Sequence, residues 1–145
     1  KKLPVMKTRL KTAKDRSAAP SPVRVLVADD SAFARAHLRQ LISSRGLDVV
    51  GEAANAAEVL DRYSVLRPDV VTMDLIMPGL TGLDAILALR DLDPDCKIVL
   101  ITAVREDPII KGLPAMGISV VHKPVRWREL ETALRGSLSA NSGAS

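Results

Sequence analysis

The most constraining feature of this sequence is the regular alternation, from Val23 onward, of two kinds of segment. Short apolar runs rich in Val, Ile and Leu are typical of buried strands, and they alternate with longer segments whose apolar residues recur at helical spacing. This pattern predicts an α/β fold in which a five-stranded, parallel, doubly wound sheet is covered by helices on both faces. The predicted strands span 23–28, 48–53, 69–73, 97–101 and 118–122, and the predicted helices span 32–45, 56–66, 83–92, 107–115 and 127–138.

Local signals bear on several helix ends. Asn55 is a good N-cap for the second predicted helix, and Gly46 suits the C-terminal end of the first. The fourth predicted helix is weak, because Pro108 is tolerated only in its first turn and Gly112 and Pro114 disfavour its continuation. We therefore expect the fourth helix to be short or mobile.

Charge is distributed unevenly along the chain. Residues 1–22 contain seven basic residues and one acidic residue, whereas residues 23–145 contain 14 basic and 16 acidic residues. The net charge of +4 thus comes from the N-terminal segment, and the pattern does not indicate direct nucleic-acid binding. Because 1–22 lack a hydrophobic period, we interpret them as a flexible basic arm or as residues foreign to the natural protein. The predicted domain covers 23–139, and a disordered tail is expected at 140–145.

The composition also bears on location. No apolar run approaches the roughly 20 residues that span a bilayer, and nothing is similar to a secretory signal. Cys96 is the only cysteine and cannot form an internal disulfide, which fits a reducing compartment. We expect a cytoplasmic protein that does not insert into a membrane.

Polar residues follow four of the five predicted strands. Asp29 and Asp30 follow the first strand, Asp74 the third, Thr102 the fourth and Lys123 the fifth. In an open parallel sheet the carboxyl ends of the strands meet at one edge, where ligands bind. Taken singly, each polar residue has a structural explanation as a cap, turn or surface residue. Their joint placement predicts a site that combines three carboxylates, a hydroxyl and an ammonium group.

The chemistry of these groups indicates phosphoryl transfer. Three crowded carboxylates repel one another unless a cation joins them, and oxygen donors suit a hard ion such as Mg²⁺, with Mn²⁺ as a substitute. A carboxylate can attack a phosphoryl group to form an aspartyl phosphate. Catalysis of that transfer consists mostly of positioning and charge neutralisation, to which Lys123 and a hydrogen bond from Thr102 would contribute.

These residues, in this order, resemble the receiver domains of bacterial response regulators, over about residues 23–138. The resemblance implies a flavodoxin-like (βα)5 fold with strand order 2-1-3-4-5. The motifs that carry it are Asp29-Asp30, Asp74 followed by Met77-Pro78 and Gly82, Thr102-Ala103, and Lys123-Pro124. The stretch from Asp30 to Arg35 is most similar to the chemotaxis type, which includes single-domain regulators and the receiver of the methylesterase.

The resemblance assigns roles to the acidic residues. It implies that Asp74 is the phosphoacceptor. It implies that Asp29, Asp30 and Asp74 bind the metal ion, together with the backbone carbonyl of Ile76. The catalytic activity implied is limited to self-phosphorylation and slow self-dephosphorylation, so the domain is expected to be a signalling module and not an enzyme.

The resemblance also implies the remaining parts of the switch. Thr102 and Lys123 are expected to sense the phosphate, and the Lys123–Pro124 bond is expected to be cis. The phosphodonor would be a histidine kinase or phosphotransfer protein. A downstream protein would bind the face formed by the fourth helix, the fifth strand and the fifth helix. Two positions depart from the family pattern, because Val120 replaces the usual aromatic residue that reports phosphorylation and Thr81 replaces a frequent acid.

Several alternatives stay open from the sequence alone. The chain is either a stand-alone regulator or a receiver fragment of a larger multidomain regulator, and with Val120 it is also compatible with a scaffold-like receiver whose readout is atypical. A haloacid-dehalogenase-type phosphatase is disfavoured because Asp29 and Asp30 are adjacent. A nucleotide or flavin binder would need a Gly-rich or hydroxyl-rich phosphate loop after the first strand.

Four other residues have side chains that are often found in functional sites. His37 and His122 do not have a metal-ligand spacing, although His122 precedes Lys123 and lies near the expected site. Cys96 lacks the basic surroundings of a nucleophile. Trp127 begins the last predicted helix and is equally compatible with packing and with partner contact.

Overall fold

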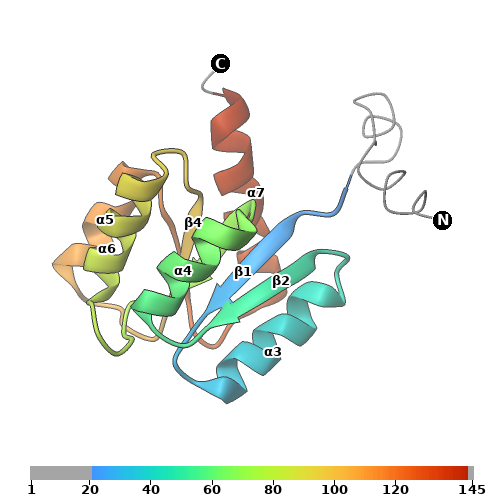
Figure 1. Ribbon diagram of the computed structural model, residues 1–145, viewed down its shortest axis with the longest axis horizontal. Coiled ribbons are helices and arrows are strands. Elements are labelled where there is room, and N and C mark those ends of the chain that lie inside the picture. The colour runs from blue at the N-terminus through green and yellow to red at the C-terminus, as the bar shows by residue number, and fades with distance from the viewer. Residues whose placement is uncertain (1–20, 144–145) are drawn as a thin grey trace.

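The computed structural model describes residues 21–143, and within this range the sheet has five parallel strands in the order β2-β1-β3-β4-β5 (Figure 1). This confirms the fold class and the strand order expected from the sequence. The predicted basic arm, 1–22, lies outside the described residues except for Ser21 and Pro22. The strands are β1 (Arg24–Ala28), β2 (Asp48–Ala53), β3 (Val70–Met73), β4 (Ile98–Thr102) and β5 (Ser119–His122).

Helices connect successive strands and cover both faces of the sheet (Figure 1). Their N-caps are polar side chains that accept a hydrogen bond from the first turn: Ser31 for α3, the predicted Asn55 for α4, and Thr81 for α5. These caps satisfy amide groups that would otherwise lack partners. The helices are α3 (Ala32–Ser43), α4 (Ala56–Leu66), α5 (Gly82–Leu92), α6 (Pro108–Gly112), the 3-10 turn η1 (Leu113–Met116) and α7 (Trp127–Gly143).

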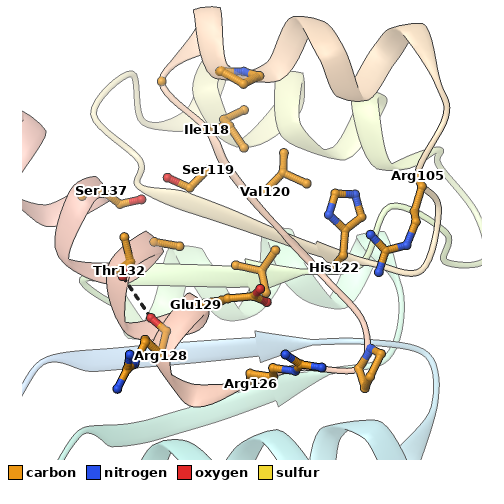
Figure 2. Close-up of a pocket in the computed structure, with 16 residues that line it drawn as sticks. Arg105, Ile118, Ser119, Val120, His122, Arg126, Arg128, Glu129, Thr132 and Ser137 are labelled. Atoms are coloured by element: carbon orange, nitrogen blue, oxygen red, sulfur yellow. Dashed lines mark hydrogen bonds between the residues drawn. The ribbon is translucent and has the colours of Figure 1, made fainter.

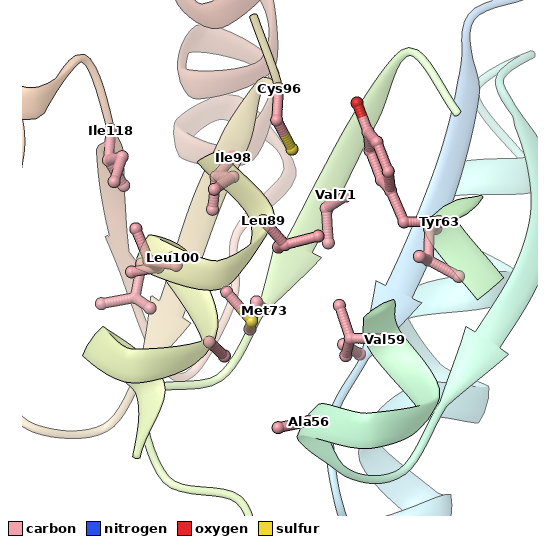
Figure 3. Close-up of a cluster of buried hydrophobic side chains, with 14 of the residues drawn as sticks. Ala56, Val59, Tyr63, Val71, Met73, Leu89, Cys96, Ile98, Leu100 and Ile118 are labelled. Atoms are coloured by element: carbon pink, nitrogen blue, oxygen red, sulfur yellow. The ribbon is translucent and has the colours of Figure 1, made fainter. Parts of the chain in front are cut away.

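One hydrophobic core lies between the sheet and helices α4, α5 and α6. Alternate side chains of the strands, among them Val71, Met73, Ile98 and Leu100, pack against these helices (Figure 3). The central strands β3 and β4 are buried along their whole length. This burial explains why their sequences are continuous apolar runs instead of alternating patterns.

A second core lies on the opposite face, under α3 and α7. The strand residues between those of the first core, such as Val27 and Val99, pack here against Leu38 of α3 and Leu130 of α7. Trp127 packs at the border of this cluster, and the Arg45 guanidinium lies 5.3 Å from the centre of its ring. The structure therefore gives Trp127 a packing role.

Four helices differ in their bounds from the sequence expectation. The first, α3, ends at Ser43 instead of Arg45, and α5 begins at Gly82, one residue earlier than predicted. The fourth helix is short, as predicted, and after Gly112 the chain continues as the 3-10 turn η1. The last helix is longer than predicted, because α7 continues to Gly143 instead of ending at Leu138. The helical backbone therefore continues into the tail predicted at 140–145, and residues 144–145 lie outside the described residues.

Candidate metal and phosphoacceptor site

Three carboxylates meet where β1 and β3 end. Asp29 and Asp30 follow β1, and Asp74 follows β3, its neighbour in the sheet. One carboxylate oxygen from each residue lies within 4.8 Å of the others. Asp29 and Asp74 are buried, whereas Asp30 is exposed. The juxtaposition predicted for these three residues is therefore present.

Lys123 extends from the end of β5 into this acidic group. Its Nζ lies 2.7 Å from Oδ2 of Asp29 and 2.9 Å from Oδ2 of Asp74. Burial alone would lower the pKa of Lys123, but the hydrogen bonds and the negative charges of Asp29 and Asp74 together raise that pKa. Lys123 therefore stays positively charged and offsets part of the negative charge. The Lys123–Pro124 peptide bond is cis, as expected.

Asp29 is held by several bonds besides that from Lys123. Its backbone N–H donates to the Ala53 carbonyl of β2, and its Oδ1 accepts from the Ser31 N–H at 2.9 Å. Its backbone carbonyl accepts a 2.7 Å hydrogen bond from Arg35. The sequence had given Arg35 no role, although its position in the first turn of the helix that follows the acidic pair was a usable signal.

Asp74 and Ile76 form a local turn after β3. Oδ1 of Asp74 accepts a hydrogen bond from the Ile76 N–H at 3.2 Å, while Oδ2 contacts Lys123. The Ile76 side chain is 64% exposed. Its backbone carbonyl stays a predicted metal ligand.

Thr102 lies at the end of β4, next to Lys123. The Lys123 N–H donates to the Thr102 carbonyl at 2.9 Å, and the Thr102 side chain is fully buried. The Thr102 hydroxyl accepts a hydrogen bond from the Val104 N–H at 3.1 Å. The structure thus brings Thr102 to the expected edge of the sheet, where its hydroxyl also supports the loop between β4 and α6.

The three carboxylates fit a hard divalent ion. Oxygen ligands of Mg²⁺ lie about 2.1 Å from the ion, so ligands on opposite sides of one ion are about 4.2 Å apart. The three carboxylate oxygens already lie within 4.8 Å of one another, so small movements would bring them to one ion. The position of Lys123 between two of the carboxylates also shows that this site attracts positive charge.

Within 21–143, the histidines and the cysteine are not part of the carboxylate cluster. Cys96 is buried, and burial raises the pKa of its thiol to about 11, which leaves it protonated and unreactive. In the same part of the chain, no helix combines the length and apolar character needed to cross a membrane.

Comparison with known proteins identifies the family. The family model for the response regulator receiver domain matches residues 25–135. The chain belongs to this family. The receiver domain is 38% identical to the chemotaxis protein CheY of Thermotoga maritima over 112 residues, which are 77% of this chain and 93% of that protein.

Other relatives contain the receiver domain within longer chains. A protein-glutamate methylesterase/protein-glutamine glutaminase of Myxococcus xanthus is 44% identical over 107 residues, which are 72% of this chain but 31% of that protein. Among solved structures, a LuxR-family two-component response regulator from an Aurantimonas species is 32% identical with a TM-score of 0.76, and the match covers 83% of this chain and 87% of that one. The similarity to the chemotaxis protein CheY confirms the chemotaxis-type resemblance seen in the sequence.

Proposed function

We propose that this receiver domain accepts a phosphoryl group on Asp74 from a histidine kinase or phosphotransfer protein, in a reaction that requires Mg²⁺. The observation that carries the proposal is the placement of Asp74 beside Asp29, Asp30 and the charged Lys123. A carboxylate oxygen of Asp74 would attack the phosphorus atom while the bond to the donor nitrogen breaks and its electron pair leaves with the donor histidine.

The chain's own residues would prepare this transfer. Asp29, Asp30, Asp74 and the Ile76 carbonyl would hold Mg²⁺, or Mn²⁺ in its place, and the ion would supply positive charge to the phosphoryl oxygens. Lys123 would move from the carboxylates to a phosphoryl oxygen. Reaction of the free domain would be limited to phosphorylation by small donors and slow loss of the phosphoryl group.

The decisive experiment is phosphorylation by acetyl phosphate in the presence of Mg²⁺, followed by intact-protein mass spectrometry. Wild type should gain the mass of one phosphoryl group, and Asp74→Asn should not. Asp61→Asn is the matched control, because Asp61 is an exposed aspartate on α4, and it should react as wild type does. Labelling of Asp74→Asn, or no labelling of wild type, would contradict the proposal and favour a scaffold-like receiver.

We further propose that a downstream protein binds the face formed by α6, β5 and α7. A groove of about 970 Å³ runs along β5, which is an edge strand, and Val120 and His122 project toward it (Figure 2). Exposed charged residues, three of them basic, surround it. They are Arg105, Arg126, Arg128 and Glu129.

Val120 replaces the aromatic residue that usually reports phosphorylation. Whether phosphorylation changes this face therefore needs a direct test. Beryllofluoride with Mg²⁺ should shift the backbone NMR signals of β5 and of the first turns of α7 in wild type but not in Asp74→Asn. Shifts confined to the acidic site would contradict a switch at this face. Two further expectations stay predictions: that this chain is part of a longer regulator, and that the protein is cytoplasmic.

A further inference from the structure

We propose that Arg35 is a positioning residue of the metal site, which acts by holding the peptide unit that joins Asp29 to Asp30. The inference rests on the proposed function, because it concerns how the same site binds Mg²⁺. The Arg35 Nη1 donates a 2.7 Å hydrogen bond to the backbone carbonyl of Asp29. That carbonyl belongs to a planar unit that also contains the Asp30 nitrogen. One bond from Arg35 therefore restrains the backbone of two of the three carboxylates.

The bond from Arg35 completes a set of restraints on Asp29. The Asp29 N–H is bonded to Ala53, and its carboxylate oxygens are bonded to Ser31 and Lys123. The carbonyl is the remaining polar group of this buried residue, which is 1% exposed. Without Arg35 the peptide unit after Asp29 could rotate, and both acidic side chains would move with it.

Glu52 fixes the orientation of the Arg35 guanidinium. The Arg35 Nε contacts Oε1 of Glu52 at 3.0 Å, and the Arg39 Nε contacts Oε2 at 2.6 Å. Glu52 lies on β2 opposite Val27 of β1, so its position is set by the sheet. The Arg35 side chain is 18% exposed, compared with 44% for Arg39. The planar fork of arginine allows Arg35 to bond Glu52 and Asp29 at the same time.

Arg39 provides a matched control, because it shares the Glu52 partner and has no bond to Asp29 among the described residues. Arg35→Met and Arg39→Met each remove one positive charge and one bond to Glu52. Only Arg35→Met also removes the bond to the Asp29 carbonyl. The comparison therefore isolates that bond.

The direction of the effect separates positioning from simple electrostatics. Removal of a nearby cation should strengthen binding of a metal cation if charge alone matters. Loss of an outer partner that orients metal ligands instead weakens metal affinity about 10–100-fold. We expect Arg35→Met to weaken Mg²⁺ binding by about tenfold or more, and Arg39→Met to leave the affinity unchanged or slightly raised.

The test is titration of the full chain with Mg²⁺ by isothermal calorimetry, with thermal unfolding of each variant as the check on folding. Arg35→Lys keeps the charge but loses the fork, so it should also bind Mg²⁺ more weakly, and it replaces Arg35→Met if that variant does not fold. Unchanged or tighter binding by the folded Arg35 variant, or equal weakening by Arg39→Met, would overturn the inference.

Asp30→Asn separates this inference from the proposed function. If wild type binds Mg²⁺ and Asp30→Asn binds it more weakly, the metal site stands and the Arg35 variants decide the inference alone. If wild type does not bind Mg²⁺, or if Asp30→Asn has no effect, the metal-dependent function itself fails and the positioning role fails with it.

Discussion

Thr72 is a buried residue whose hydroxyl has no hydrogen-bond partner among the described residues. It lies on β3 opposite Val27 of β1 and Val99 of β4, so its surroundings are aliphatic. An unpaired buried hydroxyl costs about 1–3 kcal/mol. Thr72→Val has the same shape without the hydroxyl, and we expect it to raise the free energy of unfolding by about 1 kcal/mol, measured by urea denaturation.

Thr102→Val is the matched control for this substitution. Thr102 is equally buried, but its hydroxyl accepts the Val104 N–H, so its loss should not stabilise the domain. An unfolding free energy of Thr72→Val at or below that of wild type would contradict the prediction. The strand-end pattern that predicted Thr102 as a site residue did not predict the unpaired hydroxyl of Thr72. Whether a buried hydroxyl has a hydrogen-bond partner depends on the packing around it.

Among the site residues, the sequence predicted the juxtaposition of Asp29, Asp30 and Asp74 from their positions after parallel strands. It did not predict that Lys123 bonds two of these carboxylates directly. Those contacts join residues 94 and 49 positions apart, and they depend on how far each side chain extends from its strand. The contact between Arg35 and the Asp29 carbonyl was likewise outside what a strand-end pattern can predict.

At the level of elements, Tyr63 joins α4 to the C-terminal end of α5. Its hydroxyl donates a 2.6 Å hydrogen bond to Oδ2 of Asp93, the C-cap of α5. This bond lowers the pKa of Asp93 below its ordinary value of 3.8. Burial acts in the opposite direction, whereas the Asp95 N–H and the charges of Arg67 and Lys97 also lower this pKa. Because the folded pKa is the lower one, the stabilisation is complete above about pH 4 and is lost as pH falls through the folded pKa.

Tyr63→Phe should therefore destabilise the domain by about 1–2 kcal/mol at pH 7. The difference from wild type should shrink as pH falls through the lowered pKa of Asp93, because the carboxyl group then becomes protonated. Urea denaturation at pH 7 and at low pH measures both values. A difference that does not depend on pH would show that Asp93 ionisation is not involved.

The elements themselves were predicted well where burial dictates the pattern. β2 and α4 have the predicted bounds, because apolar spacing and the Asn55 cap mark them clearly. The predicted end of α7 was wrong. The residues after Leu138 are small and polar, and no cap signal indicates that the helix continues through them. The backbone there continues the helix to Gly143, which local propensity alone does not indicate.

For the whole molecule, the proposed metal site at the acidic edge of the sheet predicts that stability depends on Mg²⁺. An ion that binds only the folded state stabilises it, by about 2.7 kcal/mol at a concentration of one hundred times Kd. We expect Mg²⁺ to raise the thermal unfolding temperature of wild type and to have a much smaller effect on Asp30→Asn. Asp61→Asn should respond as wild type does, and equal shifts in all three proteins would mean that the ion acts elsewhere.

The stacking of Arg45 on Trp127 has a practical consequence. Trp127 is the only tryptophan in the chain, it borders the core between α3 and α7, and it follows Lys123 by four residues. All indole fluorescence therefore comes from one position, at the border of the second core. A change in the contact with Arg45 would alter that emission. Stopped-flow fluorescence of the unlabelled protein can therefore measure the rate of its response to Mg²⁺ or to a phosphodonor.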